Sequence, residues 1–562
     1  MNIAEIYDRE IGDHGLHRGL SGGWLITVWL VFILSQGDHA KSNVAEWVER
    51  HAAVLQQLTG QPITAGEFND TRLGRLLSWL SQADRWERFE AALWQHSVVV
   101  YQLAKPSVGG LRSAMVDSTT AYGHHTMSDA GVMQRGYSKD HRPDLPQLKL
   151  MTAGLHPTGQ WVATEVVNGN VADDELYTPL IARVRAIFGQ VGLLYVGDCK
   201  MAALATRAEL AGHGDYYLTV APHTGEVASQ LPDWIEMALT DGQLMKDGNE
   251  TIGIAWESSR ICQARVPLGP RGGLQALEWT ERVQVIRSDS LKAKQAQTLA
   301  HHLKRGEAAL WALNQPRGRG HRRLTQWAEF EAAVQTILET QGLRGLLVVT
   351  PHLEEQREQR LVGRGRRGPN RPTREVVVQR FTVASVQRDQ AAIAAQVERL
   401  GWRVQLTNAP LTISLTTCVT HYRANWLGER NYHLLKHQPI GISPLFVRND
   451  DQIIGLTHLL TLGVRVLSLI ELQVRRGLQA EGTPLSGLYA GNPKQATDRP
   501  TAMAILEAIA RMEITLTLII GPEQTVTHLT ALPPLLVQFL NYLRLPTTLY
   551  MNLATQNSLN TS

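Results

Sequence analysis

Over the first hundred residues, the spacing of apolar side chains is helical. Apolar residues recur every three to four positions, which predicts helices over 21–35, 40–58 and 70–104. Aspartates and glutamates are mixed with the basic residues throughout this stretch, so it is not a simple basic arm. We interpret residues 1–105 as a helical N-terminal domain.

A different pattern begins near residue 110. Short apolar runs bounded by turn residues predict strands at 111–118, 147–154, 159–167 and 192–200. A helix is predicted over 172–189, where acidic residues occupy the first turn. The first and fourth strands are each predicted to end at an aspartate, Asp117 and Asp198. The order strand, strand, strand, helix, strand is the beginning of a ribonuclease H-like α/β fold.

A third acidic residue stands on a predicted helix within residues 421–439. At about 100° per residue, one polar stripe contains Tyr422, Asn425, Glu429, His433 and Lys436. The opposite, apolar side is expected to contain Leu427, Tyr432, Leu434 and Leu435. Trp426, near the edge of the stripe, is expected to pack in the core. A carboxylate beside donors and a cation suits metal-dependent phosphodiester chemistry, whereas a solvated helix face with an i,i+4 pair is the alternative.

The glutamate helix begins roughly 220 residues after the fourth strand, so the interval is interpreted as an inserted α+β domain. Its predicted elements are a strand at 215–221, helices at 287–315, 325–341 and 388–400, and strands at 345–351 and 374–386. The predicted organisation is a helical region 1–105, a first core part 106–221, an insertion 222–410, a second core part 411–475 and a helical C-terminal region 476–562.

The charge of the chain is close to balanced, at +3, but arginines gather in two segments of the insertion. Segments 316–323 and 357–374 are rich in arginine, and glycine and proline in the second predict a mobile loop. On a chain that handles nucleic acid, such residues contact phosphates. The arginines assigned this role are Arg317, Arg319, Arg322, Arg323, Arg360, Arg364, Arg366, Arg367, Arg371 and Arg374.

Cysteine usage and hydropathy indicate a cytoplasmic protein without a membrane segment. The three cysteines are isolated, which predicts neither a disulfide framework nor a zinc knuckle. The N-terminal residues lack the layout of a signal peptide. The apolar run 24–34 is too short to span a bilayer, and 453–472 contains His458 and Arg465, so both are predicted to be buried helices.

The three acidic residues suggest a two-metal site. Asp117 and Asp198, at the ends of adjacent core strands, are expected to lie side by side, with Glu429 reaching them from a helix. Hard oxygen ligands of this kind hold two Mg²⁺ ions, for which Mn²⁺ substitutes. A polyanionic substrate then requires cations nearby, which Lys139, Arg142 and Lys436 could supply.

With these residues in place, the chain resembles the DDE transposases of bacterial insertion sequences that carry a large insertion before the last catalytic residue. The resemblance rests on AMVDST around Asp117, GYSKDHRPDLPQLKL at 136–150, YVGDCKM around Asp198, and the spacing of Tyr422, Glu429 and Lys436. The family has an arginine where this chain has Asn425.

The resemblance implies that Asp117, Asp198 and Glu429 form the metal-binding catalytic triad and that Tyr422 and Lys436 position phosphates. It further implies cleavage at terminal inverted repeats, strand transfer into target DNA, a homodimer or larger synaptic complex, and a nucleoid-associated protein in the cytoplasm. The N-terminal region would bind DNA ends or dimerise.

Two other functions remain compatible with these residues. A structure-specific nuclease would use the same carboxylates without transposon ends. A DNA-binding protein that has lost catalysis would keep the fold, and Asn425 is the feature that favours it.

Overall fold

The computed structural model describes residues 1–12, 19–103, 105, 108–248, 250–267, 274–315, 324–363, 372–520 and 525–550. The chain divides into two compact units. Unit 1 comprises Met1–Val220, Ile261–Glu281 and Leu406–Ser562, and unit 2 comprises Ala221–Arg260 and Arg282–Gln405. Apart from Ala221, the second unit lies within the interval 222–410 that was predicted as an insertion, but residues 261–281 and 406–410 of that interval belong to unit 1.

Unit 1 contains five strands of a mixed sheet in the order β3-β2-β1-β4-β5. Their bounds are β1 Ser113–Tyr122, β2 Gln147–His156, β3 Gln160–Asn168, β4 Leu194–Gly197 and β5 Tyr216–Ala221. The first three strands are antiparallel to one another, whereas β4 runs parallel to both β1 and β5. The first nine residues of β2 are all buried, including the polar residues Gln147, Lys149 and Thr152.

Strand β1 is longer than its sequence predicted. It continues past Asp117 to Tyr122 because each residue from Ser113 to Tyr122 pairs with β2. The prediction that Asp117 ends this strand was therefore wrong, whereas Asp198 does directly follow β4. The helix between β3 and β4 is α6, Tyr177–Phe188, preceded by a short 3-10 helix, η2, at Asp173–Leu176.

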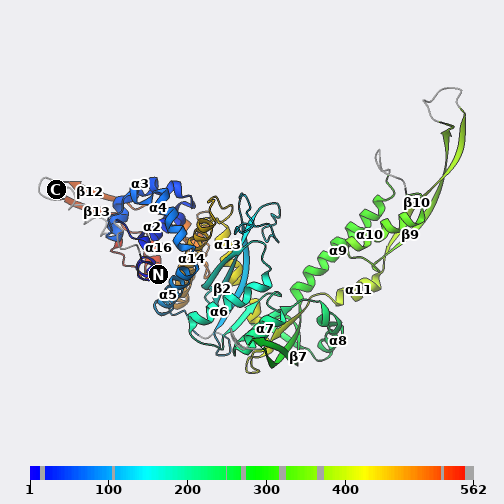
Figure 1. Cartoon of the computed structure of the whole chain (residues 1–562), viewed down its shortest axis with the longest axis horizontal. Coiled ribbons are helices and arrows are strands. Elements are labelled where there is room, and N and C mark those ends of the chain that lie inside the picture. Colours follow the sequence, from blue (N-terminus) through cyan, green and yellow to red (C-terminus); the bar gives the residue numbers. More distant parts are fainter. Residues whose placement is uncertain are drawn as a thin grey trace. The chain divides into compact units, whose positions relative to one another are not determined.

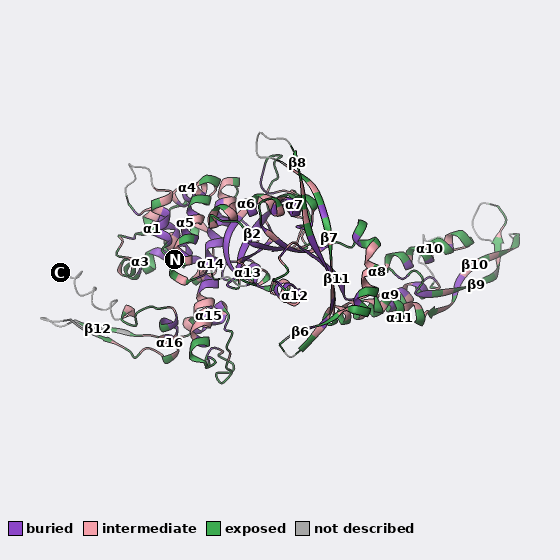
Figure 2. Ribbon diagram, turned by 90° about the horizontal axis from the view of Figure 1, so that it is seen from below, coloured by how far each residue is buried: buried purple, intermediate pink, exposed green. Residues whose placement is uncertain are grey.

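The N-terminal helices pack in one core with the long helix α14, Asp450–Glu481. They are α1 Ile3–Glu10, α2 Gly22–Gln36, α3 Lys41–Thr59, α4 Asp70–Leu80 and α5 Ala83–Tyr101. One long helix was predicted over 70–104, but the chain breaks between α4 and α5 at residues 81–82. Figure 1 labels α14 beside α5 and the sheet, and Figure 2 colours much of α14 as buried.

Helix α14 is long and apolar enough to cross a membrane by length and composition, but 83% of its most apolar window is buried inside the protein. Arg465, near the middle of this helix, forms an ion pair with buried Glu90 of α5. Because protein already covers its apolar surface, α14 packs as a core helix does.

The predicted single helix over 421–439 is two helices. Helix α12 spans Leu415–Arg423 and α13 spans Trp426–Lys436. Between them, the amides of Leu427 and Gly428 bond to carbonyls three residues earlier, at Ala424 and Asn425. This tight turn interrupts the regular 3.6-residue winding, so Tyr422 and Glu429 do not share a helix.

The C-terminal region contains α15, Ala502–Ala510, and α16, Pro534–Tyr542. The helical prediction for 476–562 was wrong between these helices, where β12 (Leu516–Ile520) pairs with β13 (Thr525–Leu529) as an antiparallel hairpin. β-Branched residues, such as Thr525 and Val526, favour strands over helices in this segment.

Unit 2 contains a small core between α9 (Asp289–Ala312), α10 (Trp327–Thr340) and the hairpin of β9 (Leu347–Leu361) and β10 (Thr373–Arg388). The end of its chain carries α11, Gln390–Glu398, and leads into β11, Trp402–Thr407. Several elements of 222–290 were not predicted: α8 Gly225–Asp241, β6 Gln243–Asp247, β7 Glu250–Pro267 and β8 Leu274–Ser288.

The second arginine-rich segment is partly regular structure. Arg357 and Arg360 lie on β9, and Arg374 lies on β10. The prediction of an irregular loop over all of 357–374 was wrong at both ends, because backbone pairing between the strands continues to Leu361 and Thr373. Residues 364–371 between the strands, and the whole of segment 316–323, lie outside the described residues.

Candidate active site

Asp117 lies on β1, and Asp198 is the first residue after the neighbouring parallel strand β4. The register of β1 and β4 pairs Ser113 with Leu194 and continues to Val116 with Gly197. The next residues in this register are Asp117 and Asp198. Because adjacent strands lie about 4.8 Å apart and parallel pairs in register point to the same face, the two carboxylates are neighbours.

The electrostatics of Asp117 reflect this neighbour. Burial raises the pKa of Asp117 above its ordinary value, and the negative charge of Asp198 adds to the rise. The charge of Lys139 and a hydrogen bond from the Ser118 amide lower the pKa of Asp117, but they do not cancel this rise. Two adjacent carboxylates, one of them poorly solvated, form a site that gains from a cation.

Lys139 supplies part of that positive charge. Its Nζ lies 3.4 Å from Asp117 Oδ1 and donates hydrogen bonds of 2.7 Å to the carbonyl oxygen and the hydroxyl of Ser118. Its backbone amide bonds to Thr120 Oγ1. The loop before β2 is thereby attached to β1, with Lys139 beside Asp117.

Asp198 is held by a residue that sequence reasoning did not identify. The hydroxyl of Tyr177, the first residue of α6, donates a 2.6 Å hydrogen bond to Asp198 Oδ1. The amide of Lys200 donates to the same oxygen at 2.9 Å. Burial raises the pKa of Tyr177 well above its ordinary value, so its hydroxyl stays protonated and acts as a donor. The sequence carried no signal for this contact.

Helix α13 is anchored directly beside Asp117. The Tyr432 hydroxyl lies 2.8 Å from Thr152 Oγ1, and Thr152 is the residue of β2 that pairs with Asp117. Asn425, Gly428 and Tyr432 line a small cavity together with Asp117. Tyr432 is buried in the core with Leu434 and Leu435, as the apolar side of the helix predicted, and its hydroxyl turns to a polar partner on the sheet.

The two other predicted cations are both paired. Lys436 Nζ donates a 2.5 Å hydrogen bond to Asp140, a residue that the sequence did not single out. Arg142 pairs with Asp144 at 2.9 Å, and its guanidinium lies 5.3 Å from the centre of the Tyr122 ring.

Glu429 does not converge on the two aspartates. Its side chain is exposed, and within the described part of the chain it has no hydrogen bond or ion pair. Among the described residues, no group of three His, Cys, Asp or Glu side chains is arranged to hold a metal ion. Tyr422, on α12, packs against a separate apolar cluster that contains Cys418 and Leu427.

The residues fit a divalent cation in part. Asp117 and Asp198 supply adjacent carboxylate oxygens, which are the ligands that Mg²⁺ prefers. Glu429 carries a carboxylate on the helix whose neighbouring turn lines the cavity beside Asp117. With no competing partner among the described residues, it remains available as a third oxygen donor.

Trp426 was expected in the core, but its side chain is 48% exposed. In unit 2, Arg360 and Arg374 are cross-strand partners on the β9–β10 hairpin, and both are exposed. The other arginines assigned to DNA contacts lie outside the described residues: Arg317, Arg319, Arg322, Arg323, Arg364, Arg366, Arg367 and Arg371.

No family model and no curated protein matches the chain. Among solved structures, it is similar to a piggyBac transposase, seen by cryo-electron microscopy in a synaptic complex with hairpin DNA. The two share 9% sequence identity with a TM-score of 0.25, over 51% of this chain and 55% of that one. The present chain therefore spans about half the length of the transposase that it matches.

Proposed function

We propose that this protein is a DDE transposase that cleaves DNA at transposon ends and transfers the strands into target DNA, with Mg²⁺ as its cofactor. The observation that carries the proposal is the register of β1 and β4, which ends at the pair Val116 and Gly197, so that Asp117 and Asp198 are the next residues and the charge of Asp198 acts on Asp117. The strand order β3-β2-β1-β4-β5, with three antiparallel strands followed by two parallel ones, supports a ribonuclease H-like core.

In this proposal each described side chain has a defined task. Asp117 and Asp198 hold the cation, and Glu429 completes its oxygen ligands. Bound Mg²⁺ would supply activation of the attacking oxygen and neutralisation of charge on the leaving one. Tyr177 keeps Asp198 oriented through its hydroxyl. Lys139, beside Asp117, offsets the charge of the substrate phosphate.

The proposed substrate is double-stranded DNA, carrying terminal inverted repeats at the transposon ends. Exposed Arg360 and Arg374 would contact its phosphates from unit 2. Two ends must be cut together, so the active form would be a homodimer or larger, acting at the nucleoid in the cytoplasm.

One observation favours a second function. Exposed Glu429 has no contact with either aspartate among the described residues, as expected of a DNA-binding protein that has lost catalysis. A ribonuclease H-like nuclease with another DNA substrate would use the same carboxylates and differs only in the DNA that it cuts.

The test is nicking and strand joining on a labelled duplex taken from the DNA that flanks the gene, with Mn²⁺ present. Glu429→Gln and Asp198→Asn should each reduce product by at least about a hundredfold. Asp174→Asn, an equivalent change at an exposed aspartate near the start of α6, should retain activity.

Equal products from wild type and Glu429→Gln would remove Glu429 from the mechanism. Tight binding of the duplex without product from wild type or any variant would support the second function, a DNA-binding protein that has lost catalysis. Cleavage that is independent of the terminal repeats would support the nuclease.

A further inference from the structure

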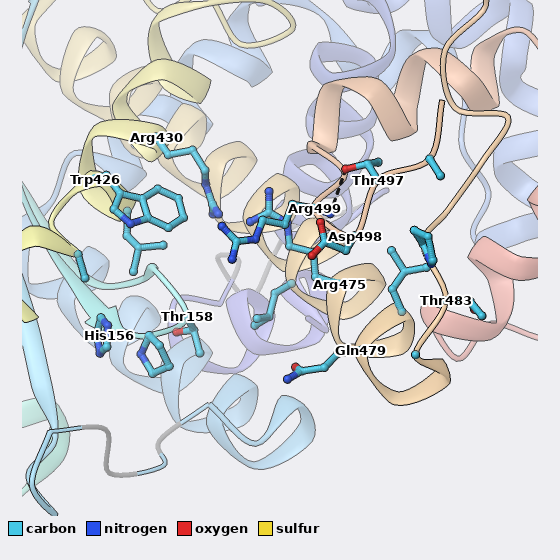
Figure 3. Close-up of a pocket in the computed structure, with 18 residues that line it drawn as sticks. His156, Thr158, Trp426, Arg430, Arg475, Gln479, Thr483, Thr497, Asp498 and Arg499 are labelled. Carbon is cyan, nitrogen blue, oxygen red and sulfur yellow. Dashed lines mark hydrogen bonds between the residues drawn. The ribbon is translucent and has the colours of Figure 1, made fainter. Parts of the chain in front are cut away.

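We infer that a second site in unit 1, on the other side of α13, binds a single-stranded segment of DNA through its phosphates. The site is a pocket of about 960 Å³, near the upper end of the roughly 300–1,000 Å³ that is usual for ligand sites. Its walls are the turn between β2 and β3 at 156–158, helix α13, the end of α14 and residues 482–499 (Figure 3).

Three arginines from three different elements line this pocket. They are Arg430 of α13, Arg475 of α14 and Arg499 of the segment before α15. In Figure 3 their side chains reach toward the same space. Their convergence from positions far apart in the sequence concentrates positive charge in a hollow, where charge attracts an anion more strongly than on a flat surface.

Two of these arginines are held in place before any ligand binds. Buried Glu471 accepts a 2.9 Å bond from Arg430 Nη1 and forms an ion pair with Arg475. The other Glu471 oxygen accepts a hydrogen bond from the amide of Ala502. Arg475 Nε donates a 3.1 Å hydrogen bond to the carbonyl of Pro500. A ligand that meets fixed guanidinium groups loses less affinity to side-chain ordering.

The charges around the pocket leave an excess of one positive charge. Glu471 behind the arginines and Asp498 on the wall are two carboxylates against three guanidinium groups. Burial lowers the pKa of His156, another lining residue, to about 4, so it is neutral at pH 7.

Donor capacity also remains unused. Exposed Arg499 forms no ion pair among the described residues. Guanidinium groups bind phosphate oxygens with particularly good geometry.

The shape of the site selects a single strand. A duplex is a stiff rod whose phosphates lie on a convex surface, so it can touch the rim of a pocket but not enter it. A single strand bends freely enough to place a phosphate inside.

The position of the pocket connects it with the proposed transposase, on which this inference rests. Trp426 and Arg430, which line it, stand three residues before and one residue after Glu429 on α13. A strand that leaves the catalytic carboxylates along this helix would therefore pass the mouth of the pocket.

The test measures binding without catalysis. A fluorescein-labelled oligothymidylate of about 12 nucleotides is titrated with the full chain in EDTA, and its anisotropy is followed across a series of salt concentrations. Arg499→Glu should weaken binding at least tenfold. Arg499→Ala should make the slope of log K against log salt shallower by about 0.7, the contribution of one single-strand phosphate contact.

Lys494→Glu is the matched control, since Lys494 is exposed in the same segment but does not line the pocket. Its binding should stay within twofold of wild type. Ala496→Trp fills the pocket without changing its charge and should also weaken binding. Melting temperatures show whether each variant is folded.

Equal losses from Arg499→Glu and Lys494→Glu would overturn the inference in favour of diffuse surface charge. Competition by inorganic phosphate or a mononucleotide at the affinity of the strand would overturn it in favour of a small-anion site. Strand binding with these mutational effects, but without nicking in the catalytic assay, would keep the pocket and reject the transposase. Nicking in the catalytic assay without these mutational effects on strand binding would keep the transposase and reject the pocket.

Discussion

Lys436 of α13 donates a 2.5 Å hydrogen bond to Asp140, and Asp140 also accepts a 3.0 Å hydrogen bond from Thr120 of β1. One carboxylate in the loop before β2 thus ties the helix that carries Glu429 to the strand that carries Asp117. Lys436 was expected to contact a substrate phosphate, but in this structure its charge is engaged within the protein.

This bridge should be measurable as a coupling between two residues. The side chains of Lys436 and Asp140 are only 23% and 14% exposed. We expect Lys436→Met to lower the free energy of unfolding by about 1–3 kcal/mol, because it leaves a mostly buried carboxylate without its cation. A double-mutant cycle with Asp140→Asn, followed by urea denaturation, should give a coupling of about 1 kcal/mol.

The exposed pair Arg50–Glu46 is the comparison for this cycle, with side chains 65% and 77% exposed. Its coupling should be close to zero, since water screens both charges. An equally small coupling for Lys436 and Asp140 would mean that the bridge does not anchor α13.

Asp117 should weaken the fold at neutral pH. Its pKa is raised in the folded protein, mainly by burial, so ionisation is less favourable there than in the unfolded chain. The resulting cost is present above the folded pKa and disappears below the unfolded value of about 3.9. Asp117→Asn should therefore unfold at a higher urea concentration than wild type at pH 7, and this gain should vanish as the pH falls to about 3.9.

Asp174→Asn, at an exposed position, provides the baseline for the pH series. An Asp117→Asn variant that is no more stable than wild type at pH 7 would show that Lys139 fully compensates the buried charge.

A divalent cation should stabilise the protein through the two aspartates. Binding relieves the repulsion between Asp117 and Asp198, and a ligand at 100 times its dissociation constant adds about 2.7 kcal/mol. Mn²⁺ should therefore raise the melting temperature of wild type, which differential scanning fluorimetry can follow without any DNA. Asp198→Asn should lose this increase, and its persistence in that variant would place the cation elsewhere.

The β9–β10 hairpin should contribute to DNA affinity through cross-strand partners Arg360 and Arg374. Each phosphate contact on duplex DNA contributes about 0.9 to the slope of log K against log salt. Replacing both arginines with alanine should make that slope shallower by up to about 1.8 in a duplex titration.

Arg344→Ala is the control for the hairpin, because Arg344 is exposed in unit 2 but lies outside β9 and β10, and it pairs with Glu339 as Arg360 pairs with Glu358. If the slope of the double variant matches that of this control, the described part of the hairpin does not bind phosphate.

Local pattern in the sequence was sufficient for elements whose burial is uniform or periodic. Strands β2 and β3 and helix α2 lie within one or two residues of their predicted limits, because apolar side chains mark where each is buried. The pattern failed where hydrogen bonding decides the backbone. The turn at Ala424–Asn425 and the hairpin of β12 and β13 depend on pairings that an apolar count does not register.

By itself, the sequence determined which acidic residues follow or lie in apolar strands, and hence the pair Asp117 and Asp198. Only the tertiary structure decided their surroundings: Tyr177 on Asp198, Tyr432 on Thr152, and three arginines in one pocket. The physical reason is the separation along the chain of the residues that interact. Periodicity depends on neighbours within one helical turn or two strand positions, whereas these contacts join residues tens to hundreds of positions apart, and strand register and packing alone bring them together.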